Sequence, residues 1–157
     1  SLKIDSYWQN KFPTQQRWED AMKADGTINR SATPAIFNPE DLNALEQALR
    51  LKDAHPLTVT ILTMGPGRAA EVIREGLYRG ADNGYLLTDR AFAGADTLAT
   101  SYALATAIRK IGDYDIIIGG RRIDGDTAQV GPQVAEKLGL TQVTYAEEIL
   151  NVDKAAG

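Results

Sequence analysis

From residue 38 to the end of the chain, short β-rich runs alternate with segments whose apolar residues recur at helical spacing. The β-rich runs cover residues 57–64, 85–88, 115–118 and 142–145. Repeated strand–helix–strand units of this length imply a parallel sheet whose strands are joined by right-handed helical crossovers. We therefore predict an α/β fold built on a doubly wound parallel sheet, with helices on both of its faces.

The segments between these runs contain residues that are typical of the first and last positions of helices. Asn38 is a typical N-cap residue and Pro39 suits the first helical position. The acidic residues Glu40 and Asp41 then complement the positive end of the helix dipole. Glycines predict the ends of three later helices, at Gly80, Gly112 and Gly139.

The first 37 residues do not share this alternation. They contain both tryptophans of the chain, Trp8 and Trp18, and no evident strand. We therefore predict that the 157 residues divide into a lead-in segment at 1–37 and an α/β domain at 38–157.

Composition excludes several classes of function. The absence of cysteine excludes disulfides, thiolate catalysis and cysteine-ligated metal clusters, and a single histidine, His55, excludes sites with several histidines. A net charge of −4 without a basic run predicts no positively charged surface that would bind nucleic acid or an anionic membrane. No stretch approaches the ~20 apolar residues of a membrane span. We expect no nucleic-acid or membrane partner and a cytoplasmic location.

Ligands of open parallel sheets bind beyond the carboxyl ends of the strands, so the turns that follow the predicted strands are candidate sites. The most unusual turn follows the run at 115–118. Its residues are Gly119, Gly120, Arg121, Arg122, Ile123, Asp124, Gly125, Asp126, Thr127, Ala128, Gln129, Val130 and Gly131. Arginines suit phosphate, glycine and threonine can cradle it, and aspartates accept hydrogen bonds from ribose hydroxyls. This composition favours a nucleotide site over a solvated loop with surface charges.

A second turn, at 65–70, reads GPGRAA and follows a predicted strand. It matches the glycine pattern of dinucleotide-binding turns, with an acid, Asp89, after the next strand. Pro66 removes one backbone donor from this turn, and an ordinary strand-to-helix turn explains both glycines. An oxidoreductase domain that binds NAD or FAD at this turn is therefore an alternative hypothesis.

A third turn leads into the helix that begins near Asp96 and Thr97. Either residue suits the N-cap, and the exposed amides of such a helix start can meet a phosphate. Capping alone explains most of this pattern. No nucleophile is spaced with a base in a recognisable catalytic arrangement, so we predict no catalytic residue.

Five segments in this order carry longer motifs. They read NPEDLNALE at 38–46, TMGP at 63–66, YRGAD at 78–82, DRAFAGADT at 89–97 and IDGDTAQVGP at 123–132. Together they resemble the electron transfer flavoprotein beta subunits, over about residues 26 to 150. The last two motifs are the most specific.

This resemblance implies an adenine-nucleotide alpha-hydrolase-like (Rossmann-like) fold and a subunit that carries electrons without catalysis of its own. It implies an electron transfer flavoprotein alpha subunit as partner, a flavin-dependent dehydrogenase such as an acyl-CoA dehydrogenase as electron donor, and AMP or FAD as cofactor. The segment at 92–97 is similar to that of bifurcating-type members, which favours FAD. The implied nucleotide contacts are Asn38, Pro39, Glu40, Asp41, Met64, Asp96, Thr97 and the loop from Gly119 to Val130.

The chain departs from the family pattern in two places. Members of the family open with an apolar strand that contributes to the nucleotide pocket, whereas residues 1–14 do not read as such a strand. The later strands and the C-terminal arm of the family are also expected beyond residue 157. A truncated or diverged domain that binds no nucleotide and pairs with another chain is therefore a second alternative.

Overall fold

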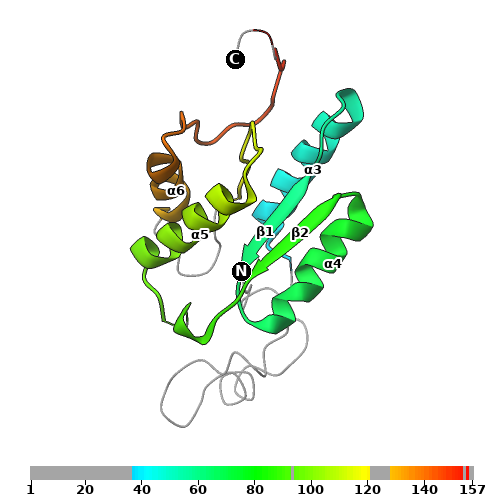
Figure 1. The fold of residues 1–157 in the computed structure, drawn as a ribbon. Coiled ribbons are helices and arrows are strands. Elements are labelled where there is room, and N and C mark those ends of the chain that lie inside the picture. Colours follow the sequence, from blue (N-terminus) through cyan, green and yellow to red (C-terminus); the bar gives the residue numbers. More distant parts are fainter. Residues whose placement is uncertain (1–36, 93, 121–127, 154, 156–157) are drawn as a thin grey trace, which may run out of the picture.

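The computed structural model describes residues 37–92, 94–120, 128–153 and 155, and every structural statement below concerns these residues. The helices, in chain order, are α3 (Pro39–Ala54), α4 (Ala70–Arg79), α5 (Thr97–Ile111) and α6 (Val130–Leu138). The strands are β1 (Thr60–Met64) and β2 (Asn83–Leu87), and the short 3₁₀ turns are η1 (Gly67–Ala69) and η2 (Arg90–Phe92). Figure 1 shows their arrangement.

The two strands form a parallel sheet. Thr60 pairs with Asn83 at one end of the register and Met64 pairs with Leu87 at the other. Helix α4 makes the crossover between the strands and lies on one side of them, whereas α5 and α6 lie on the other side (Figure 1). The predicted α/β fold with a parallel sheet is therefore confirmed.

The predicted helix ends are confirmed in detail. Asn38 is the N-cap of α3, where its side chain accepts a hydrogen bond from the Glu40 amide at 3.2 Å. Asp96 caps α5 in the same way and accepts from the Ala99 amide at 2.8 Å. The residues that follow α4, α5 and α6 are the three predicted glycines, each with a positive φ that few other residues adopt: Gly80, Gly112 and Gly139.

Two predicted strands are wrong, because neither 115–118 nor 142–145 is a strand. An apolar run becomes a strand only when another strand supplies ladder hydrogen bonds, and β1 and β2 pair only with each other in the described part of the chain. The run at 115–118 is also not buried, with Ile116 52% and Ile117 43% exposed. The described sheet therefore has two strands.

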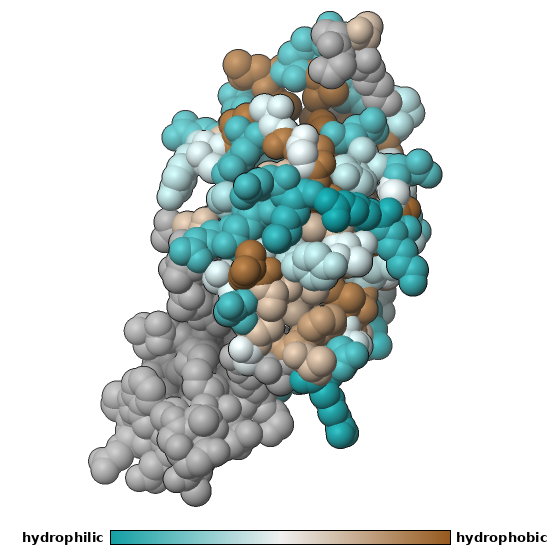
Figure 2. Space-filling view, turned by 60° about the vertical axis from the view of Figure 1, so that its left-hand side comes forward, coloured by the Kyte–Doolittle hydropathy of each residue, from teal (hydrophilic) through white to brown (hydrophobic). Residues whose placement is uncertain are grey.

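A small core lies where α3, α4 and β1 meet. Its buried members are Phe37, Leu45, Val59 and Ala81. Glycines allow the helix and sheet to approach closely: a Cβ on Gly84 of β2 would lie 2.1 Å from Cγ2 of Ile73 in α4. Several large apolar side chains are exposed elsewhere, and on the face drawn in Figure 2 hydrophobic patches are separated by a band of hydrophilic side chains.

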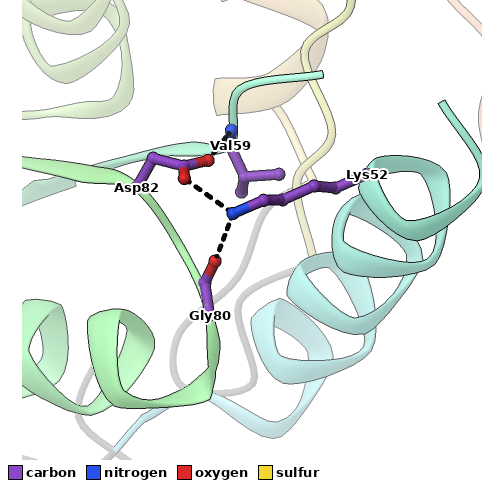
Figure 3. A network of polar contacts seen from close by, with 4 residues as sticks. All are labelled: Lys52, Val59, Gly80 and Asp82. Carbon is purple, nitrogen blue, oxygen red and sulfur yellow. Dashed lines mark hydrogen bonds and ion pairs between the residues drawn. The ribbon is translucent and has the colours of Figure 1, made fainter. Parts of the chain in front are cut away.

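A polar network ties the end of α3 to the sheet (Figure 3). The Lys52 ammonium donates to Asp82 Oδ1 at 2.6 Å and to the Gly80 carbonyl at 2.9 Å. The other oxygen of Asp82 accepts from the Val59 amide at 2.8 Å. The hydrogen bond from Lys52, followed by that from the Val59 amide, lowers the pKa of Asp82. The network joins three elements at the amino end of the sheet.

Among the described residues, no helix has the length and apolar character needed to cross a bilayer. All of the predicted lead-in at 1–37 except Phe37 lies outside the described residues, so the division of the chain after residue 37 stays a prediction.

Candidate functional site

The turns after β1 and β2 lie at the carboxyl edge of the sheet, toward which both arrowheads in Figure 1 point. Met64 ends β1 and pairs with Leu87 at the end of β2. Helix α4 follows the first of these turns and α5 follows the second. The predicted site residues Met64, Asp96 and Thr97 therefore come from the edge where parallel sheets bind ligands.

The structure brings the start of α3 and the start of the glycine-rich loop together. Asp41 Oδ1 accepts a hydrogen bond from the Gly120 amide at 2.8 Å, across 79 positions of sequence. Asp41 Oδ2 accepts from Asn38 Nδ2 at 3.0 Å. Asn38 is only 1% exposed. Three predicted site residues thus form one connected group.

Close packing reinforces this group. A Cβ on Gly120 would lie 2.2 Å from the Glu40 carbonyl carbon and 2.4 Å from the Asp41 amide nitrogen. Backbone atoms in a helix cannot yield as a side chain can, so only glycine fits here. A Cβ on the neighbouring Gly119 would meet no described atom within 4 Å. The two adjacent glycines therefore have different roles.

A second group lies at the other end of the loop. Thr97 Oγ1 in the first turn of α5 donates to Gln129 Oε1 at 2.9 Å. Gln129 is the N-cap of α6, and its side chain makes no capping hydrogen bond. The Gln129 side chain therefore links α6 to α5 instead of closing its own helix start.

Sequence reasoning missed two residues that extend this link. Ser101, which is fully buried, lies with its Oγ 2.9 Å from Gln133 Oε1. Ser101 follows Thr97 by four positions, and Gln133 follows Gln129 by four, so the pairs lie on adjacent turns of facing helices. The matching four-residue spacing of hydroxyl and amide side chains was the available signal.

The remaining predicted residues fall into two sets. Pro39 and Glu40 form the first turn of α3, and Val130 opens α6. Ala128 has a positive φ of 56°. The predicted contacts that lie outside the described residues are Arg121, Arg122, Ile123, Asp124, Gly125, Asp126 and Thr127.

The alternative turn at 65–70 has a different geometry. The Gly65 amide donates to the Leu87 carbonyl at 3.1 Å, and the Ala69 amide donates to the Pro66 carbonyl at 2.8 Å. The 3₁₀ turn η1 stands between the strand and α4. The amides of Gly65 and Ala69 are thus already used within the protein.

Two hydrogen bonds hold the described residues on either side of 121–127. Asp41 and Thr97 hold residues 120 and 129 through hydrogen bonds. A Cβ on Gly119 or on Gly131 would meet no described atom within 4 Å. Within the described ranges, no group of three His, Asp or Glu side chains could hold a metal ion.

Comparison with known proteins identifies the family of the chain. The family model described as "Electron transfer flavoprotein domain" matches residues 25–155. The protein named FixA from Azorhizobium caulinodans is 58% identical over 134 residues, which are 82% of this chain and 48% of that protein. The electron transfer flavoprotein subunit beta of Clostridium acetobutylicum is 56% identical over 125 residues, 79% of this chain and 48% of that protein.

A third relative is the caffeyl-CoA reductase–Etf complex subunit CarD of Acetobacterium woodii. It is 54% identical over 133 residues, which are 83% of this chain and 51% of that protein. The chain thus spans about half the length of the curated relatives it matches. Since the family model covers most of the sequence, the chain belongs to the electron transfer flavoprotein domain family and is of the beta-subunit type.

Proposed function

We propose that this chain binds an adenine nucleotide, AMP or FAD, at the loop 119–130 and supports electron transfer as a beta-type subunit. The observation that carries the proposal is the tethering of this loop at both ends. Asp41 holds Gly120, and Thr97 holds Gln129, so a distant motif holds the described residues on each side of 121–127. Holding both ends of a segment lowers the conformational entropy that the segment loses when it binds a ligand.

The residues proposed to hold the nucleotide have separate tasks. The arginines Arg121 and Arg122 suit the phosphates, and the aspartates of the loop suit the ribose hydroxyls. The open backbone at Gly119 allows close approach. A bound FAD would supply redox chemistry through its flavin ring, whereas AMP would be structural. The motif at 92–97 favours FAD within this proposal.

The partners that we propose are inferred from relatives of which this chain spans about half the length. The relative from Acetobacterium woodii is named as a subunit of a caffeyl-CoA reductase–Etf complex, and the relative from Clostridium acetobutylicum as a subunit beta. These names support an alpha-type partner subunit and a flavin-dependent dehydrogenase or reductase as electron donor. An adenine-nucleotide alpha-hydrolase-like fold and a cytoplasmic location are further parts of the proposal.

The dinucleotide-binding alternative at 65–70 has less support. The amides of Gly65 and Ala69 are used within the protein, and η1 separates the turn from α4. Tight pyrophosphate turns lead directly into a helix whose first amides point at the ligand.

The test begins with the purified chain. We expect heat denaturation to release AMP or FAD, which chromatography of the supernatant identifies. Gln129→Ala should then lower the nucleotide content, and Gly67→Asp should leave it unchanged. The opposite pattern would favour the turn at 65–70. Absence of both nucleotides, with no binding when either is added, would favour a domain that only pairs with another chain.

A further inference from the structure

The first two residues of β2, Asn83 and Gly84, form an asparagine–glycine step, and both are exposed. No other asparagine in the chain is followed by glycine. The side-chain amide of an asparagine can react with the backbone nitrogen of the next residue, and glycine hinders this nitrogen least because it has no side chain. Asn83 therefore has both the neighbour and the access to water that spontaneous deamidation requires.

Packing explains why residue 84 is a glycine. A Cβ at this position would lie 2.1 Å from Cγ2 of Ile73 in α4. Ile73 is only 9% exposed, and its β-branched side chain has little rotamer freedom to move away. The close approach of α4 to β2 thus calls for the residue that makes Asn83 reactive.

The fold also restrains the reaction. Deamidation needs the Gly84 nitrogen in contact with Cγ of Asn83, whereas the extended backbone of a strand keeps the nitrogen of the next residue away from that carbon. Asn83 is held in this conformation, because it pairs with Thr60 and its amide donates to the Val59 carbonyl at 3.3 Å. The reaction therefore requires a local opening at the start of β2.

The network in Figure 3 opposes this opening at the residue before Asn83. The Lys52 ammonium donates to Asp82 Oδ1 at 2.6 Å, and the Val59 amide donates to Asp82 Oδ2 at 2.8 Å. The Asp82 amide in turn donates to the Val59 carbonyl at 2.8 Å. Separation of β2 from β1 at this end breaks these contacts.

We propose that Asn83 is a site of spontaneous deamidation and that the contact between Lys52 and Asp82 slows its reaction. The Gly84 nitrogen forms a bond to Cγ of Asn83, the bond from Cγ to the side-chain nitrogen breaks, and ammonia leaves with the Gly84 amide hydrogen. Water then opens the cyclic imide at either of its carbonyls, which leaves aspartate or isoaspartate. Water is the only co-reactant.

Either product disturbs the start of β2. Aspartate at 83 places a second carboxylate next to Asp82, and the two compete for Lys52. Isoaspartate lengthens the backbone between residues 83 and 84 by one carbon, which the regular spacing of the strand does not accommodate. The modified chain should therefore be less stable than the unmodified chain.

The experiment compares the folded chain with the chain unfolded in urea, both incubated in the same mildly alkaline buffer. Digestion and mass spectrometry then detect replacement of the side-chain NH₂ by OH at residue 83. We expect modification in both samples, at least about tenfold faster in the unfolded chain. Asn151, which is followed by the β-branched Val152, is the internal control and should react more slowly than Asn83 in the unfolded chain. Unmodified Asn83 in the unfolded chain would overturn the site.

Lys52→Met tests the restraint in the folded chain. It should speed modification of Asn83 by about twofold to fivefold, as expected for loss of a partly exposed ion pair. Arg50→Met, on the same helix and paired only with Glu46 in the contacts of its side chain, is the matched control and should react like wild type. Equal rates in Lys52→Met and wild type would overturn the restraint.

Hydrogen exchange of the Asn83 amide in the wild-type chain serves if Lys52→Met does not fold. Exchange measures the same opening, so its protection factor should match the factor by which folding slows deamidation. A strongly protected amide with no slowing of deamidation would overturn the restraint.

Discussion

The Lys52 ammonium lies 2.6 Å from Asp82 Oδ1 and joins the last turn of α3 to the turn that precedes β2. Because Asp82 also accepts from the Val59 amide, one carboxylate connects a helix with the segments leading into both strands. The pair lies 30 positions apart in sequence, so it closes a tertiary contact rather than a local one.

The first prediction concerns pH. The pKa of Asp82 lies below its ordinary value of 3.8, chiefly because of Lys52. Its stabilising effect is therefore complete above that ordinary value and is lost as the pH falls through the lower pKa of the folded state. We expect Asp82→Asn to lower the melting temperature at neutral pH, with the difference from wild type shrinking as the pH falls below about 4.

The surface pair Arg79–Glu75, four positions apart on α4, is the control for this effect. Glu75→Gln should change the melting temperature little, since exposed helical pairs contribute weakly. An equal loss of stability in Glu75→Gln and Asp82→Asn would mean that net charge, not the network, is responsible.

The second prediction concerns packing at Gly84. Its Cβ would lie 2.1 Å from Cγ2 of Ile73, and a β-branched side chain in a helix has little rotamer freedom to move away. Gly84→Ala should therefore lower the free energy of unfolding by about 1–3 kcal/mol, although alanine is ordinarily the better strand residue. Denaturant titration measures this change.

Gly67→Ala is the matched control for Gly84→Ala. A Cβ at Gly67 meets no described atom within 4 Å and its φ is not positive. This variant should be neutral or stabilise by up to about 1 kcal/mol, because the unfolded chain loses freedom. Stabilisation by both substitutions would contradict the close approach of α4 to β2.

The third prediction compares two adjacent glycines. Gly120→Ala places a Cβ against the backbone of Glu40, whereas Gly119→Ala meets no described atom. Gly120→Ala should separate the loop from α3 and lower the affinity for nucleotide by about tenfold or more, through loss of the Asp41 hydrogen bond. Calorimetric titration of both variants tests this, and equal affinities would contradict it.

The fourth prediction concerns the contact between α5 and α6. Ser101 is fully buried and its hydroxyl lies 2.9 Å from Gln133 Oε1. Ser101→Ala leaves that amide without its partner and should lower the free energy of unfolding by about 1–3 kcal/mol. Thr106→Val, at an exposed position of the same helix, should cost less than about 1 kcal/mol. Thermal or denaturant unfolding of the two variants should separate them.

Local features were predictable from the sequence, because their cause lies within one turn of chain. The caps at Asn38 and Asp96 and the helix end at Gly80 depend on neighbouring residues only. The strand predicted at 115–118 failed because a strand depends on a partner elsewhere in the chain.

In the candidate site, too, the residues were predictable from local motifs, whereas their contacts were not. The sequence motifs predicted that one site contains Asp41, Gly120, Thr97 and Gln129. They did not predict which of these residues contact one another. Their contacts span 79 and 32 positions, and spacing of this kind carries no local signal. The structure adds a contact that the motifs did not predict, the hydrogen bond that Asp41 accepts from the Gly120 backbone amide.

The central claim is that the chain binds an adenine nucleotide, and melting of the nucleotide-free chain tests it most directly. The chain would be stripped of bound nucleotide, refolded, and heated with AMP, with FAD and with neither. Binding to the folded state raises its stability by about 2.7 kcal/mol at a concentration one hundred times the dissociation constant. We predict a higher melting temperature with AMP or with FAD. An unchanged melting temperature with both, for a chain that has refolded, would contradict the account.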